Sequence, residues 1–115
     1  MVKEYIPEKG DIVWLEFDPQ KGYEQKGRRP ALVLTPKIYN QKTKLAIFCP
    51  ITSKIKGYPF EVLLPANFPL KGVILVDQIK SLDWKRRKAQ FICKLNEDLF
   101  KTVLEKIFLL LSAEE

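Results

Sequence analysis

The chain has 115 residues, of which 46% are hydrophobic and 30% charged, a composition typical of a globular protein rather than a disordered segment. We expect a single domain over residues 1–115, with a core small enough that dimerisation would help to stabilise it. Twenty basic residues against 14 acidic ones leave a net charge of +6, which favours an anionic partner such as a nucleic acid or an acidic protein.

Several classes of site are excluded by what the sequence lacks. It contains no histidine, which rules out histidine triads, histidine-ligated metals and imidazole acid–base pairs. Cys49 and Cys93 stand in apolar runs without CxxC spacing, a pattern that indicates buried reduced thiols rather than a zinc site. We therefore expect no metal and no other cofactor. No apolar run reaches the length of a membrane span and residues 1–5 include no signal region, so we expect a cytoplasmic protein.

Four short strands are indicated over the first 64 residues by β-branched and aromatic residues between Gly, Pro and Asp. They span Asp11–Phe17, Ala31–Leu34, Lys44–Cys49 and Phe60–Leu64. Pro36–Gln41 predicts a helical turn after the second strand. Ile51–Pro59 is a polar loop, and we expect Pro50 to end the strand before it.

The next residues continue the pattern of strands and turns. Val73–Leu82 predicts one long strand, interrupted by the polar pair Asp77-Gln78. The basic run Lys85–Lys88 predicts a hairpin turn into a last strand, Ala89–Cys93, with at most a minor role in attracting anions. Many short strands with closely spaced turns favour a mainly β barrel.

A change of period predicts a helix at the C-terminus. Asn96 is a suitable N-cap, and Glu97 and Asp98 suit the first turn. Apolar residues then follow helical spacing from Leu99 to Leu111. The apolar stripe is wide, which leaves two interpretations open. The helix covers the open end of the barrel, or its surplus apolar surface meets a second copy of the chain.

The loop between the first two strands carries the densest chemistry. It contains Asp18-Pro19, Gly22 and the charged string from Glu24 to Arg29. Glycines let such a loop lie close to a ligand, and an acid, an amide and two guanidinium groups between stiff strands suit the handling of a phosphodiester.

RNA scission without metal or histidine needs a base, a cation for the phosphorane oxygens and a proton donor. Arginine suits the second task because its planar fork meets phosphate oxygens and stays charged. Arg29 directly precedes Pro30, which restrains its backbone. The residues alone leave a second interpretation equally open, in which Arg29 only forms an ion pair with an acid such as Asp77 to close the barrel mouth.

RNA binding would require aromatic side chains to stack on bases and cations to follow phosphates. Each candidate taken alone is an ordinary surface or core residue, but together they predict a groove. They are Phe17, Lys21, Gln25, Arg28, Lys54, Lys56, Tyr58, Gln78 and Lys80, with Tyr23 beside them.

Three motifs also resemble a known family. GDIVWLEFDPQKGYEQKGRRPALVL (Gly10–Leu34), CPITSKIKGYPFEVLL (Cys49–Leu64) and GVILVDQIKSLDW (Gly72–Trp84) are similar, in order and spacing, to the MazF/PemK/Kid toxins of bacterial type II toxin–antitoxin pairs, most of all the MazF branch. The resemblance implies a small SH3-like β-barrel of the CcdB/MazF type with a C-terminal α-helix, assembled as a homodimer.

The resemblance also implies an activity. It suggests a sequence-specific, metal-independent endoribonuclease that cleaves single-stranded RNA, chiefly mRNA, and leaves 2′,3′-cyclic phosphate and 5′-hydroxyl ends. A separate antitoxin would lay an acidic tail over the basic groove. In this family the arginine before the proline is catalytic, which is Arg29 here. Thr52 would grip the scissile phosphate with it, and Glu24 would be the base.

Asp77 stands where one branch of the family has a catalytic aspartate. The Kid branch uses the aspartate of its DQ motif together with an arginine two residues earlier, a position that is Leu75 here. The pair is incomplete, so we expect Asp77 to be structural or auxiliary and to form an ion pair with Arg29 or Lys80. Two other functions stay open, a non-catalytic barrel that grips a protein such as DNA gyrase, and a metal-dependent nuclease, which the scattered acids disfavour.

Overall fold

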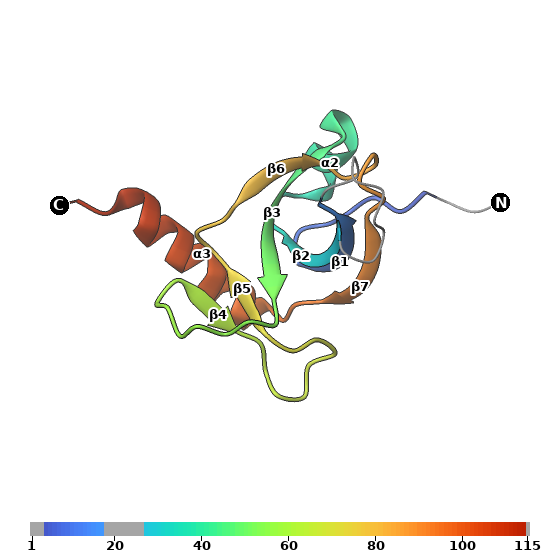
Figure 1. Ribbon diagram of the computed structural model, residues 1–115. Helices are drawn as coiled ribbons and strands as arrows, with labels where there is room; N and C mark the ends of the chain where they lie inside the picture. Colours follow the sequence, from blue (N-terminus) through green and yellow to red (C-terminus); the bar gives the residue numbers. More distant parts are fainter. Residues whose placement is uncertain (1–3, 18–26, 115) are drawn as a thin grey trace.

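A computed structural model describes residues 4–17 and 27–114, over which the chain forms one seven-stranded antiparallel sheet and two helices (Figure 1). The strands are β1 (Asp11–Glu16), β2 (Arg28–Val33), β3 (Leu45–Thr52), β4 (Glu61–Leu63), β5 (Val73–Leu75), β6 (Lys80–Asp83) and β7 (Gln90–Lys94). The helices are α2 (Lys37–Thr43) and α3 (Glu97–Ser112).

The strand order is β4-β5-β3-β2-β1-β7, and β6 also pairs with β3. The strands bend around a common centre, so that the sheet resembles a barrel, although it does not close on itself (Figure 1). The predicted mainly β barrel with a C-terminal helix is confirmed.

Apolar residues on both faces of the central strands build two cores. Ile12 of β1 packs in one cluster with Cys49, Ile74 and α3, whereas Val13 and its alternate neighbours pack in the other with Phe48 and Trp84. Successive strand residues point to opposite faces, so the continuous run of β1 supplies both cores. Cys49 is buried and Cys93 half-buried, and both are free thiols as predicted.

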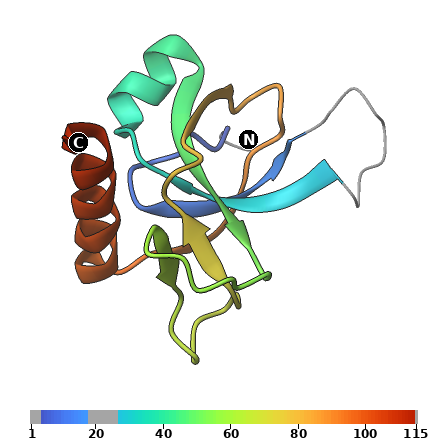
Figure 2. The same cartoon turned by 60° about the vertical axis from the view of Figure 1, so that its left-hand side comes forward.

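Helix α3 begins as the sequence predicts. The Asn96 side chain caps it by accepting a hydrogen bond from the Leu99 backbone N–H at 2.8 Å. The helix stands along one side of the barrel next to β4 (Figure 2). Val103 is buried against the core, but Phe108 and Leu111 remain 70% and 73% exposed. Neither described helix combines the length and apolarity needed to cross a bilayer.

The prediction of one strand over Val73–Leu82 is wrong. The segment forms β5 and β6, and a turn separates them, with the Gln78 backbone N–H donating to the Leu75 carbonyl at 3.3 Å. Both strands pair with β3, where Ile51 lies opposite Ile74 and Phe48 opposite Lys80. The two β3 residues between these pairs, 49 and 50, therefore lie opposite five residues, 75–79. The extra residues form a bulge that points outward and includes Asp77 and Gln78.

Three other boundaries differ from prediction. Pro50 lies inside β3 rather than at its end, opposite Ala31 of β2. Arg28 and Arg29 are the first residues of β2 and not part of the preceding loop. Lys85–Lys88 is a turn, but it is not a hairpin turn, because β6 pairs with β3 and β7 with β1. The helical turn predicted at Pro36–Gln41 is present as α2.

Candidate functional site

A cavity of about 470 Å³ opens where the ends of β1, β2 and β3 meet the β5–β6 turn, and we call it the groove. Most candidate residues described by the structure line it, although the sequence scatters them over more than 60 positions. The described lining residues are Phe17, Arg29, Pro50, Ile51, Thr52, Lys54, Lys56, Tyr58, Phe60, Glu61, Leu75, Asp77, Gln78 and Lys80.

Arg29 and Arg28 follow each other in β2 but have different surroundings. Arg29 lies opposite Leu15 in the β1–β2 register, and its exposed side chain lines the groove. Arg28 is not a lining residue, and its guanidinium donates a hydrogen bond to Gln90 of β7. Adjacent strand residues point to opposite faces, so of the two only Arg29 reaches the groove. Nothing in this arrangement supports RNA contact by Arg28.

Thr52, the last residue of β3, presents a hydroxyl with one bond already made. Its Oγ1 accepts a hydrogen bond from the Lys54 backbone N–H at 3.2 Å, which leaves its hydroxyl hydrogen able to donate. The neighbouring strand passes very close. A Cβ at Gly72, where φ is +130°, would lie 2.0 Å from the Thr52 carbonyl oxygen. Glycine at position 72 thus permits the approach that holds Thr52 in place.

The predicted ion pair of Asp77 with Arg29 or Lys80 is wrong. The salt bridges between described residues do not include Asp77, because the β5–β6 bulge carries it to the exposed rim of the groove. Behind it lies Cys49. Burial, and to a lesser extent the negative charge of Asp77, raise the pKa of the Cys49 thiol to about 12. The thiol is therefore neutral at ordinary pH and is no nucleophile.

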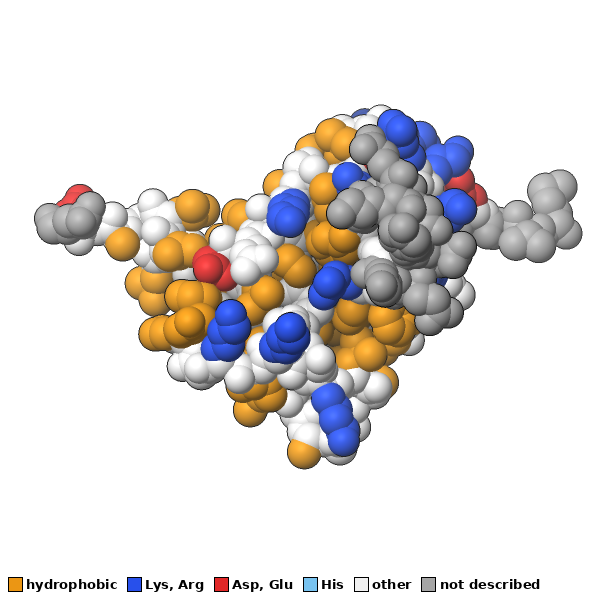
Figure 3. Space-filling view, in the orientation of Figure 1, with side chains coloured by type: hydrophobic (Ala, Val, Ile, Leu, Met, Phe, Trp, Pro, Cys, Tyr) orange, Lys and Arg blue, Asp and Glu red, His pale blue; other side chains and the backbone are white. Residues whose placement is uncertain are grey.

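Positive charge dominates the groove. Its described lining residues include four cations, Arg29, Lys54, Lys56 and Lys80, and two carboxylates. The salt bridges formed between described residues involve none of these cations. Figure 3 shows Lys and Arg side chains across the middle of this face, with few acidic groups near them. Within the described residues, no three Asp, Glu or Cys side chains gather where they could hold a metal ion.

Two aromatic surfaces flank the cations. Tyr58 and Phe60 lie with their ring centroids 5.1 Å apart and an interplanar angle of 31°. On the other side, the Lys80 ammonium lies 5.8 Å from the centre of the Phe17 ring. Aromatic faces beside a cationic track are the arrangement by which proteins bind single-stranded nucleic acid.

Three candidates, Lys21, Glu24 and Gln25, lie outside the described residues, as does Tyr23. Their proposed roles stay predictions. Sequence reasoning also missed residues that line the groove, Phe60 and Glu61 above all.

The barrel and its cationic, aromatic-flanked groove define the class, a small β protein built to bind a phosphodiester chain. Residues 8–111 match the family described as PemK-like, MazF-like toxin of type II toxin–antitoxin system. The chain belongs to this family, and the predicted family is confirmed.

Similar proteins of known name and similar solved structures support the same family. The chain is 51% identical over 89 residues to the endoribonuclease toxin MazF of Escherichia coli strain K12, covering 77% of this chain and 79% of the relative. It is 35% identical over 115 residues to the endoribonuclease toxin ChpB of the same strain, covering 93% and 96%. The crystal structure of MazF (Form-I) from Deinococcus radiodurans superposes with a TM-score of 0.86 at 49% identity, covering 96% of this chain and all of that one. The expectation of a toxin endoribonuclease is thereby confirmed.

Proposed function

We propose that this protein cleaves single-stranded RNA, chiefly mRNA, at a short specific sequence and without a metal ion. The observation that carries the proposal is the convergence of Arg29 and Thr52 in one groove with cations from two further segments, Lys54 and Lys56 before β4 and Lys80 in β6. A track of cations binds the phosphate backbone, and the aromatic faces on either side hold unpaired bases.

Arg29 acts on the charge that develops during cleavage. The ribose 2′-hydroxyl attacks the adjacent phosphorus, and negative charge grows on the non-bridging oxygens. A guanidinium aimed at those oxygens by a strand stabilises the transition state more than the ground state. Thr52 donates its hydroxyl hydrogen to a phosphate oxygen and so fixes the phosphate beside Arg29.

Glu24 is the proposed base that removes the 2′-hydroxyl proton, as the family resemblance implies. The P–O5′ bond breaks as the 2′ oxygen bonds to phosphorus, and the leaving 5′ oxygen takes up a proton from solvent water. The products therefore carry a 2′,3′-cyclic phosphate and a 5′-hydroxyl. Gln78, at the rim of the groove, would contact the RNA, and Asp77 beside it would have an auxiliary role.

We further propose a cytoplasmic protein with two protein partners. Solved structures of MazE-MazF from Deinococcus radiodurans pair a 44% identical relative with MazE, which supports a cognate antitoxin here. Its acidic tail would cover the cations of the groove. The second partner is another copy of the chain, packed against the exposed apolar residues of α3, since a face of this kind is stabilised by burial.

The direct test is cleavage of a long single-stranded RNA by the purified protein in the presence of a chelator. We expect discrete fragments whose 3′ ends resist a ligase that requires a 3′-hydroxyl until the cyclic phosphate is opened and the remaining phosphate removed. Their 5′ ends should accept phosphate from a polynucleotide kinase without prior dephosphorylation. Cleavage that stops on chelation would refute the metal-independent mechanism. Intact RNA together with inhibition of DNA gyrase would support the non-catalytic alternative, which no relative named above favours.

A further inference from the structure

Residues 53–60 connect β3 to β4, and we call them the loop 53–60. At its end, the Phe60 carbonyl accepts a hydrogen bond from the Val76 backbone N–H at 3.2 Å. Four residues of the loop line the groove, Lys54, Lys56, Tyr58 and Phe60. Half of the groove's described cations, Lys54 and Lys56, therefore lie on a segment outside the β-strands.

One carboxylate holds this loop. Glu61, the first residue of β4, accepts hydrogen bonds from the Gly57 backbone N–H at 2.9 Å and from the Lys56 backbone N–H at 3.2 and 3.3 Å. Its own backbone N–H donates to the Tyr58 carbonyl at 3.1 Å. Gly57 has φ of +81°, a turn that presents consecutive N–H groups to a single acceptor.

A second contact holds the loop from the other side. The Lys106 ammonium of α3 donates to the Pro59 carbonyl at 2.5 Å. Bonds to charged groups are the stronger kind, so the two side chains together restrict the loop where its own backbone has few partners.

We propose that Glu61 is a positioning residue, which holds the loop 53–60 so that Lys54, Lys56 and Tyr58 face the RNA. This inference rests on the proposed function, because the groove is taken to bind RNA. It gives Glu61, one of the two carboxylates that line the groove beside four cations, a role other than repelling phosphate.

The two possible roles of Glu61 predict changes of opposite sign. If it only adds negative charge near the phosphates, every substitution that removes this charge strengthens RNA binding. If it positions the loop, loss of the acceptor oxygens weakens binding even though the net charge becomes more positive. The charge-free isostere Glu61→Gln keeps one carbonyl oxygen for the Gly57 N–H.

The first experiment measures steady-state cleavage of a single-site RNA oligonucleotide. For Glu61→Ala we expect KM to rise about tenfold, because two backbone donors lose a charged acceptor. We expect kcat to stay within about twofold, because Arg29 and Thr52 are untouched. Glu61→Gln should keep KM within about threefold of the unaltered chain. Glu105→Gln, an exposed acid of α3, is the control for charge alone.

A second measurement needs no RNA. Hydrogen exchange of the Lys56 and Gly57 amides should accelerate in Glu61→Ala and stay slow in Glu105→Gln. Lys106→Met should loosen the loop from the α3 side, and Lys101→Met, a neighbouring exposed lysine, should not. These exchange rates report on the loop even if the protein cleaves no RNA, which separates failure of this inference from failure of the proposed function.

Two outcomes would overturn the assignment. Lower KM in both Glu61 variants would show that the carboxylate acts only through its charge. Unchanged exchange at Lys56 and Gly57 in a folded Glu61→Ala protein, checked by circular dichroism, would show that Glu61 does not hold the loop.

Discussion

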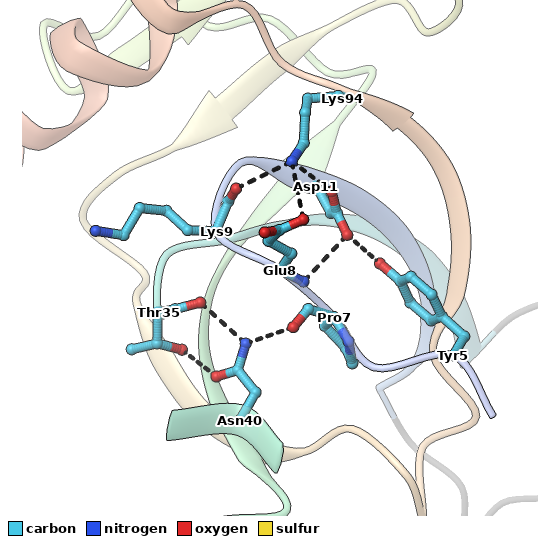
Figure 4. A network of polar contacts seen from close by, with 8 residues as sticks. All are labelled: Tyr5, Pro7, Glu8, Lys9, Asp11, Thr35, Asn40 and Lys94. Atoms are coloured by element: carbon cyan, nitrogen blue, oxygen red, sulfur yellow. Dashed lines mark hydrogen bonds and ion pairs between the residues drawn. The ribbon is translucent and has the colours of Figure 1, made fainter. Parts of the chain in front are cut away.

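Charged side chains gather both in the groove and on the N-terminal side of the barrel. The two sites differ in whether these side chains form hydrogen bonds and ion pairs with one another. In the groove, four cations face solvent beside two carboxylates, and none of them enters a salt bridge with another described residue. On the other side, Tyr5, Glu8, Asp11 and Lys94 form what we call the N-terminal cluster, in which each group has a partner within the cluster (Figure 4).

Asp11 is the centre of the N-terminal cluster. It is 4% exposed and accepts hydrogen bonds from the Tyr5 hydroxyl at 2.5 Å and the Glu8 N–H at 3.1 Å, while the Lys94 ammonium lies 3.2 Å away. Burial and the bond to Asp11 raise the pKa of Tyr5. Burial lowers the pKa of Lys94, but its bond to Asp11 and the nearby acids raise it more. Because the polar groups of the N-terminal cluster bond to one another, the cluster stabilises the fold and has no unpaired group to offer a ligand. The groove cations, in contrast, need an external anion to balance their charge.

The substitution with the largest expected effect is Arg29→Ala, which tests whether the groove serves catalysis rather than stability. We expect kcat to fall by about a hundredfold or more, because a preorganised cation at the phosphorane is lost, while urea unfolding changes little. Arg28→Ala removes the same group one residue away, where it contacts Gln90, and should cost no more than about threefold. Near-equal losses in the two variants, measured on the same oligonucleotide, would contradict the assignment.

Asp11→Asn tests whether the N-terminal cluster serves stability rather than cleavage. The variant keeps the shape but loses the charge that three donors share, so we expect the free energy of unfolding to fall by about 2 kcal/mol. Cleavage per folded molecule should not change. Glu8→Gln, at an exposed ion pair with Lys94, should lower stability by less than about 0.5 kcal/mol. A cleavage defect in folded Asp11→Asn would mean that this cluster also serves function.

Cys49 is a buried residue of β3, and its raised pKa predicts how the stability of the fold responds to alkali. The folded chain keeps the thiol proton up to about pH 12, whereas the unfolded chain releases it near 9. The folded state therefore binds more protons in this window, and stability falls as the pH rises, by up to about 1.4 kcal/mol per pH unit from this group. Urea midpoints between pH 8.5 and 10.5 should fall less steeply in Cys49→Ala. An unchanged slope would contradict the prediction.

Local signals of the sequence predicted part of this comparison. The N-cap at Asn96 and the apolar run of β1 depend on neighbouring residues, and both are found where predicted. The bulge at Asp77 is not local, because it follows from the register of β5 and β6 on β3. Glu61 escaped notice for a related reason, since its partners are backbone N–H groups, which a sequence does not distinguish from any others.

The smallest expected effect concerns a single phosphate contact. Lys54→Gln should weaken binding of single-stranded RNA by about threefold and reduce the slope of log Kd against log salt by about 0.7, because one fewer counterion is released. Lys42→Gln removes the same charge from exposed helix α2, away from the groove, and should leave the slope unchanged. If both variants shift affinity equally, RNA responds to the net charge of the chain and not to the place of its cations. A slope change confined to Lys54 assigns the contact to the groove, because non-specific attraction does not depend on which of two exposed lysines is lost.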